Sequence, residues 1–160
     1  MPERYTFDSE AILAFYLGEK GGEVVRDCLE KVQSGAAEGY INVLNLTEIY
    51  YILCRVDAKL AEEKQRNLRL YGLKVVPVED DGLWREAARV KTKHSLSLAG
   101  AFAIATAEVF GSKLVGGSDK EFEELNAHLD GRLIVNTGVD GKKVRCSREK
   151  DGGKRNSAVT

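Results

Sequence analysis

The sequence predicts an α/β domain built on a mostly parallel sheet, and three observations indicate it. Short apolar, β-prone runs alternate along the chain with longer stretches whose apolar residues recur at helical spacing. Such alternation is typical of parallel strands joined by crossover helices. The chain has 160 residues, of which 43% are hydrophobic and 31% charged, so it is long enough for one globular domain with its own core.

The expected elements follow in order along the chain, and glycine or proline separates several of them. We expect strands at residues 4–7, 40–44, 73–78, 113–115 and 133–135, each a short run of β-prone or apolar side chains. We expect helices at residues 9–17, 23–33, 45–56, 58–70, 82–93 and 98–110 and a helical turn at 119–125, most of them from apolar periodicity. Gly18 and Gly21-Gly22 are typical stop and break signals between the first two helices.

The last part of the chain differs in composition from the rest. From Gly138 onward, seven Lys and Arg residues stand against three Asp and Glu residues, so this segment carries +4 and residues 1–137 carry −5. We therefore expect one domain over residues 1–137 and a basic, flexible tail over 138–160, which would be either a nucleic-acid-binding arm or a solvated end. Asp140-Gly141 also predicts a turn joining residues 133–139 and 142–146 in a small hairpin.

Composition also bears on the compartment. No apolar run reaches the roughly 18 residues that span a bilayer, and the start of the sequence lacks the pattern of a secretory signal. The cysteines are odd in number and have no C-x-x-C spacing (Cys28, Cys54 and Cys146), which favours free thiols over a disulfide or zinc framework. We therefore expect a cytoplasmic protein without a membrane segment.

Three carboxylates stand where an active site of such a sheet would form. Asp8 follows the first strand directly, Asp119 follows the fourth by a few residues, and Glu48 lies in the first turns of the helix after the second. Ligands of open parallel sheets bind beyond the carboxyl ends of the strands, so these acids should converge. Clustered oxygen ligands suit Mg²⁺ or Mn²⁺.

Each acid also has a purely structural interpretation. Asp8 and Asp119 stand at helix starts, where an aspartate caps free N–H groups, and Glu48 could be a solvated helix residue. Glu48, however, has mostly apolar neighbours in the sequence, where an unpaired charge is costly. Gly116-Gly117 predicts a tight turn that lets the backbone approach the acids.

Other catalytic patterns are missing from the sequence. His94 and His128 are too few and too far apart in sequence to predict a metal cluster or a triad, and we expect His94 to close a helix. There is no G-x-S-x-G elbow and no phosphate-binding P-loop.

Four motifs in this order resemble those of PIN domains. They are Phe7-Asp8-Ser9-Glu10-Ala11-Ile12, Asn45-Leu46-Thr47-Glu48-Ile49-Tyr50, Ser97-Leu98-Ala99-Gly100-Ala101-Phe102 and Leu114-Val115-Gly116-Gly117-Ser118-Asp119. The resemblance spans roughly residues 4–135 and is specific only when the four are taken together.

The resemblance implies a three-layer α/β/α fold and a metal-dependent ribonuclease of the VapC toxin type. It implies Mg²⁺ or Mn²⁺ as cofactor and single-stranded or structured RNA as substrate. An antitoxin protein and a second copy of the chain are the implied partners. By resemblance Asp8, Glu48 and Asp119 match catalytic and metal-site acids, and Ser9, Asn45 and Ser118 match the polar residues beside them.

Gly100 departs from the family pattern, which places an aspartate there. If Ser97 caps the helix, position 100 is its third residue, where an acid would complete a capping box. Glycine also costs about 1 kcal/mol of helix propensity relative to alanine. Local stability therefore does not explain the glycine, and the sequence leaves open a natural loss of activity or a change that disarms a harmful nuclease.

Three hypotheses follow. The first is a metal-dependent endoribonuclease, whether or not Gly100 impairs it. The second is a non-cleaving PIN-fold module that binds RNA or an antitoxin-like protein. The third is an unrelated doubly wound domain, such as a phosphatase or receiver-like protein, with Asp8 as nucleophile; it lacks a lysine placed at a strand end.

Overall fold

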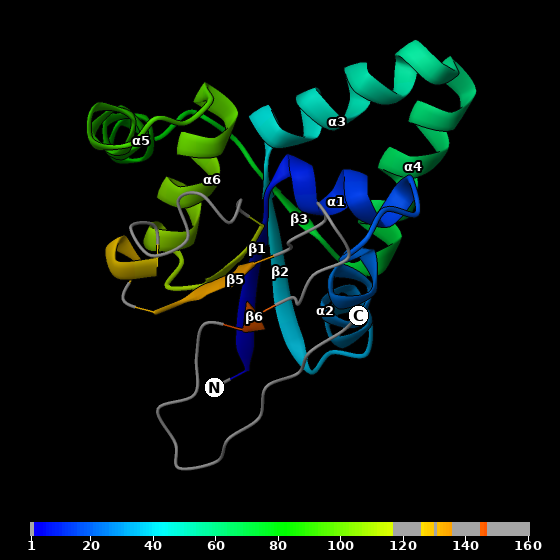
Figure 1. Ribbon diagram of the computed structural model, residues 1–160, viewed down its shortest axis with the longest axis horizontal. Helices are drawn as coiled ribbons and strands as arrows, with labels where there is room; N and C mark the ends of the chain where they lie inside the picture. Colours follow the sequence, from blue (N-terminus) through cyan, green and yellow to red (C-terminus); the bar gives the residue numbers. More distant parts are fainter. Residues whose placement is uncertain (1, 117–125, 130, 136–144, 147–160) are drawn as a thin grey trace.

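A computed structural model of the chain describes residues 2–116, 126–129, 131–135 and 145–146 (Figure 1). The strands are β1 (Glu3–Phe7), β2 (Ala37–Asn42), β3 (Lys74–Val76), β4 (Lys113–Val115), β5 (Leu133–Val135) and β6 (Arg145–Cys146). The helices are α1 (Ser9–Tyr16), α2 (Gly22–Gln33), α3 (Val43–Val56), α4 (Ala58–Tyr71), α5 (Asp81–Lys93) and α6 (Leu98–Val109). None of these helices is both long and apolar enough to cross a membrane.

The described strands form one sheet in the order β3-β2-β1-β4-β5-β6. The first five are parallel to their neighbours, and β6 pairs antiparallel with β5. In the register, Thr6 of β1 lies opposite Tyr40 of β2 and Leu114 of β4. The expected mostly parallel sheet is confirmed, and β1 and β4 lie at its centre, where the order reverses.

Side-chain alternation along the strands separates two cores. Ile41 and Val115 belong to the core under α1–α4. Their neighbours Tyr40 and Leu114 belong to the core under α5 and α6. Successive residues of a strand face opposite sides of the sheet, so β2 and β4 each contribute to both cores. Figure 1 shows α5 and α6 on one side of the sheet and α1–α4 on the other, which confirms the three-layer α/β/α architecture.

Short polar side chains set the helix starts, as local capping chemistry predicts. Asp57 accepts a hydrogen bond from the Lys59 N–H at 3.0 Å, and Asp80 accepts one from the Leu83 N–H at 2.9 Å. Each satisfies an N–H group that would otherwise be free in the first turn. His94 is the C-cap of α5, as expected.

The bounds of two strands were predicted wrongly: the strand expected at 73–78 is β3 (Lys74–Val76), and the larger difference lies in β2. The expected strand at 40–44 is β2 (Ala37–Asn42), and the next helix begins at Val43 rather than at residue 45. The Asn42 side chain accepts a hydrogen bond from the Leu44 N–H at 2.9 Å, so it caps α3. Val43 and Leu44 are apolar and extend the β-prone run, which hid this cap in the sequence.

The expected hairpin is found in part. Ile134 pairs with Cys146 and Val135 with Arg145 in an antiparallel ladder, while the turn at residues 136–144 lies outside the described residues. The pair at 145–146 thus adds a strand from the segment expected to be a tail. The division at residue 137 otherwise stays a prediction, as does the helical turn at 119–125, because those residues are not described.

Candidate active site

A cavity of about 450 Å³ opens at the carboxyl ends of the central strands. Its walls include Asp8, Ser9, Asn45, Glu48, Ser97 and Gly100. These residues come from the starts of α1, α3 and α6 and from the residues just before α1 and α6. The fourth motif contributes Leu114, so all four sequence motifs reach this one place, where parallel α/β sheets bind their ligands.

Asp8 is fixed at the junction of β1 and α1. Its backbone N–H donates to the Val115 carbonyl at 3.1 Å, and its Oδ1 accepts from the Ala11 N–H at 2.9 Å. The residue is only 8% exposed. The expected cap is thus present, and because a carboxylate has several acceptor positions, capping leaves Asp8 further capacity to bind a donor or a cation.

Gly116 brings the backbone against this carboxylate. It follows β4 with φ of +146°, and a Cβ atom built at this position would lie 2.1 Å from Asp8 Oδ2. No side chain fits there. The predicted close approach of backbone to the acid is therefore found at Gly116, while Gly117 lies outside the described residues.

Asn45 links three helix starts beneath the cavity. Its Nδ2 donates to Ser9 Oγ at 3.1 Å and to the Ala99 carbonyl at 3.1 Å. The side chain is fully buried, and its Oδ1 has no hydrogen-bond partner among the described residues. A buried oxygen of this kind is uncommon and needs a donor or a cation. Asn45 thus supplies a structural reason for a bound group at this site.

Glu48 lies one turn beyond Asn45 on α3, so the two side chains share a helix face. It is partly buried and lines the same cavity as Asp8. The structure therefore brings together two of the three predicted acids. Asp119 and its neighbour Ser118 lie outside the described residues.

Gly100 faces the same cavity as the third residue of α6. Its N–H donates to the Oγ of Ser97 at 3.0 Å, so Ser97 is the helix cap that the sequence predicted. A Cβ atom at position 100 would lie 3.1 Å from that Oγ and 3.8 Å from Leu96 Cβ. The backbone thus accepts a side chain after a small shift of the serine hydroxyl. The side chain of an aspartate at position 100 would extend from the cavity wall.

Comparison with known families identifies this arrangement. Residues 5–127 match the family model of the PIN domain. The chain belongs to the PIN domain family. PIN domains are generally nucleases that depend on divalent metals. A comparison with curated protein sequences gave no significant match.

Solved structures share the PIN fold at low sequence identity. VapBC2 from Rickettsia felis, bound to a promoter DNA fragment, is 14% identical at a TM-score of 0.61, covering 84% of this chain and 98% of that one. PAE2754 from Pyrobaculum aerophilum is 22% identical at a TM-score of 0.56, and the match covers 84% of this chain and 90% of that one. A chain of a toxin-antitoxin complex from Klebsiella pneumoniae is 15% identical at a TM-score of 0.52, and the match covers 69% of this chain and 83% of that one. At these identities the likeness concerns the fold.

A second group of titratable side chains lies elsewhere on this PIN domain. The prediction that the two histidines are too far apart for a cluster is wrong, because His94 Nε2 lies 3.4 Å from His128 Nδ1. His128 also lies beside Glu86 and Glu108, with the three ligand atoms within 4.8 Å of one another. No local motif connects these residues in the sequence, so reasoning from spacing could not find them.

Proposed function

We propose that this PIN domain is a metal-dependent endoribonuclease of the VapC toxin type whose catalytic site is impaired by Gly100. The observation that carries the proposal is that Asp8, Glu48 and Asn45 line one cavity with Gly100, and that the buried Oδ1 of Asn45 has no hydrogen-bond partner among the described residues. Membership of a family of nucleases supports the activity, and toxin-antitoxin structures with the same fold support the toxin type.

The residues present fit a hard divalent cation. Their donors are carboxylate and amide oxygens, which Mg²⁺ and Mn²⁺ prefer. Asp8 would hold the ion from the buried side, and Asp119 would complete the site. Glu48 would bind a second ion or orient the attacking water. When bound, such an ion activates water and stabilises charge at a scissile phosphate.

Because position 100 is glycine, the proposed metal ligands lack one carboxylate. Mg²⁺ demands near-ideal octahedral geometry, so a missing ligand weakens its binding. RNA affinity should change less, because phosphate contacts depend mainly on Lys and Arg. We therefore expect the chain to retain RNA binding while cleaving slowly.

The decisive experiment compares cleavage of a mixed single-stranded RNA pool by this chain, Gly100→Asp, Gly100→Ala and Gly100→Asp/Asp8→Ala. We expect Mg²⁺- or Mn²⁺-dependent cleavage by Gly100→Asp, at least about 10² times faster than by the parent, from the loss of one transition-state contact. Gly100→Ala controls for helix propensity, and Asp8→Ala should abolish the gain. Absence of RNA cleavage by every folded variant would contradict the nuclease assignment.

Gly100 also favours a second candidate function, a PIN-fold module that binds without cutting. In that case Gly100→Asp stays inert, while the parent chain binds RNA or an antitoxin-like protein. Filter binding of the same RNA pool, and co-purification with a protein encoded beside this chain, distinguish this role from the impaired nuclease.

A homodimer belongs to the same proposal. Along α3, Leu53 is 1% exposed and fills the core, whereas Tyr51 is 45% and Val56 is 67% exposed. These exposed apolar and aromatic side chains support self-association. Sedimentation velocity should show a dimer that Tyr51→Glu dissociates; a monomeric parent chain would exclude it. A reducing cytoplasm as the setting is likewise a proposal, supported by Cys28 and Cys54, which form no disulfide among the described residues.

A further inference from the structure

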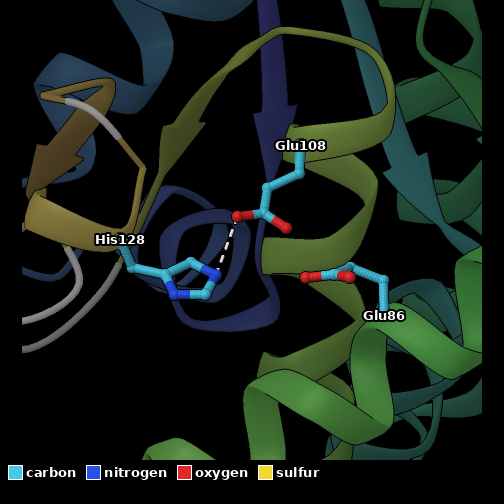
Figure 2. A group of neighbouring side chains, drawn as sticks. All are labelled: Glu86, Glu108 and His128. Atoms are coloured by element: carbon cyan, nitrogen blue, oxygen red, sulfur yellow. Dashed lines mark ion pairs between the residues drawn. The ribbon is translucent and has the colours of Figure 1, made fainter.

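We propose that Glu86, Glu108 and His128 form a binding site for a divalent transition-metal ion of the Zn²⁺ class, separate from the cavity at Asp8. Glu86 lies on α5, Glu108 near the end of α6, and His128 in the helical turn at 126–128. One ligand atom from each lies within 4.8 Å of the other two. Figure 2 shows the three side chains pointing toward one another.

The ligand types select the metal. Carboxylate and imidazole groups are both ligands of protein Zn²⁺ sites, and sites with three protein ligands keep a fourth position for water. Mg²⁺ and Ca²⁺ prefer oxygen ligands throughout, whereas imidazole suits Zn²⁺ and its neighbours in the first transition row. The cluster therefore differs in kind from the oxygen-only set around Asp8.

A second imidazole orients the first, independently of the carboxylates. His94 Nε2 lies 3.4 Å from His128 Nδ1, and the two rings meet edge to face at 89°. A metal-bound histidine usually donates the N–H of its other ring nitrogen to an acceptor, which fixes the tautomer and the ring plane, and an imidazole nitrogen can be such an acceptor. Here the contact directs His128 Nε2 toward Glu108 Oε1, 2.7 Å away.

The charges of the cluster also favour a cation. Two carboxylates and one imidazole meet here, with one ligand atom from each within 4.8 Å of the others. Like charges at this separation repel each other, and a cation between them offsets that repulsion. The side chains are 27%, 22% and 15% exposed for Glu86, Glu108 and His128, so an ion has access from solvent.

The site lies away from the cavity. Gly100 and Glu108 are on the same helix, and eight residues at 1.5 Å of rise separate them by about 12 Å along its axis. A bound ion would join α5, α6 and the segment before β5. We therefore assign it a structural role, and it does not depend on the nuclease proposal.

An ion-pair network without metal is the competing explanation. Arg89 Nη1 lies 3.1 Å from Glu86 Oε2, and a protonated His128 would pair with Glu108. That network needs no ion and predicts no effect of Zn²⁺. Metal binding to the full chain therefore separates the two explanations.

The test is isothermal titration of the chelator-treated full chain with Zn²⁺, together with thermal unfolding. We expect one Zn²⁺ bound per chain at this site and a rise in Tm of roughly 5–10 °C at about 100 times the Kd. His128→Gln and Glu108→Gln should weaken binding by more than the roughly 10–100-fold typical of outer-shell changes, and His94→Asn by an amount within that range. Co²⁺ absorption of the same variants reports the ligand field directly, so a change in stability alone cannot imitate the result.

Two matched controls localise the ion. Asp8→Asn should leave Zn²⁺ binding intact, and Glu30→Gln, which removes a glutamate facing an arginine on its own helix, should do the same. Absence of Zn²⁺ binding by the parent chain would overturn the proposal. Unchanged binding by folded His128→Gln, or loss of binding on Asp8→Asn, would equally overturn it by placing the ion elsewhere.

Discussion

Gly116 lies so close to Asp8 that a Cβ atom at position 116 would fall 2.1 Å from both Asp8 Cγ and Asp8 Oδ2. The two residues come from opposite ends of the domain sequence and meet because β1 and β4 pair in parallel, with Phe7 opposite Val115. The pairing of β1 with β4 therefore both places the buried Asp8 carboxylate and requires glycine at position 116.

Substituting Gly116 should harm both folding and the site. We expect Gly116→Ala to lower the free energy of unfolding by about 2–4 kcal/mol, since it combines backbone strain with a steric overlap. Urea denaturation measures this. Gly111→Ala is the matched control, because Gly111 also has positive φ, +58°, but nothing within 4 Å of a Cβ atom. Equal losses for the two variants would show that the carboxylate moves away freely.

Gly100→Ala should stabilise the domain by about 0.5–1 kcal/mol, because alanine has the higher helix propensity. The Cβ atom meets only the Ser97 Oγ at 3.1 Å as a close neighbour. Thermal unfolding of the parent and the variant measures the gain. A loss of stability instead would mean that the serine cap cannot shift, and would weaken the case that position 100 accepts an aspartate.

Asn45→Leu should destabilise the domain by about 2–3 kcal/mol. It removes the donors to Ser9 Oγ and to the Ala99 carbonyl, which become buried groups without their partner. Thr47→Val on the same helix is the control, because the Thr47 hydroxyl is exposed and bonds only within the helix. If both variants lose the same amount, the Asn45 network contributes no more than an ordinary helix position. Added Mg²⁺ should raise the free energy of unfolding of the parent chain by more than it raises that of the Asn45→Leu variant.

Glu3 should make stability depend on acid pH. A hydrogen bond from the Tyr5 hydroxyl lowers the pKa of Glu3 below 4.5, desolvation opposes this, and Lys113 and Lys31 add to it. A carboxyl whose folded pKa lies below its unfolded pKa stabilises the fold above the unfolded value and loses that effect as pH falls through the folded value. The side chain is 47% exposed, so the contribution should stay under about 1 kcal/mol.

Denaturant unfolding of Glu3→Gln and the parent between about pH 6 and pH 3 tests this. The difference in unfolding free energy between the parent and Glu3→Gln should be largest at about pH 6 and should shrink as the pH falls. The exposed Glu63 offers Glu63→Gln as a control that should follow the parent at every pH. A difference that grows toward low pH would contradict the assigned sign.

Local chemistry determined much of this protein from the sequence alone. Ser97 and Asp8 cap their helices through N–H groups three residues away, so neighbouring sequence is enough to predict them. The alternation of strands and helices predicted a parallel sheet, and strand ends predicted that Asp8 and Glu48 share one edge. The boundary at Asn42 escaped prediction because an apolar run continues from β2 into α3.

Only the tertiary structure decided which distant side chains meet. His94 and His128 are 34 residues apart in the sequence, and no periodicity relates a helix C-cap to a turn before β5. The buried oxygen of Asn45 and the overlap at Gly116 likewise depend on how α3, α6 and β4 pack around β1. The physical reason is that capping and periodicity act over one or two turns of chain, whereas the sheet order and the packing of helices onto it set every longer contact.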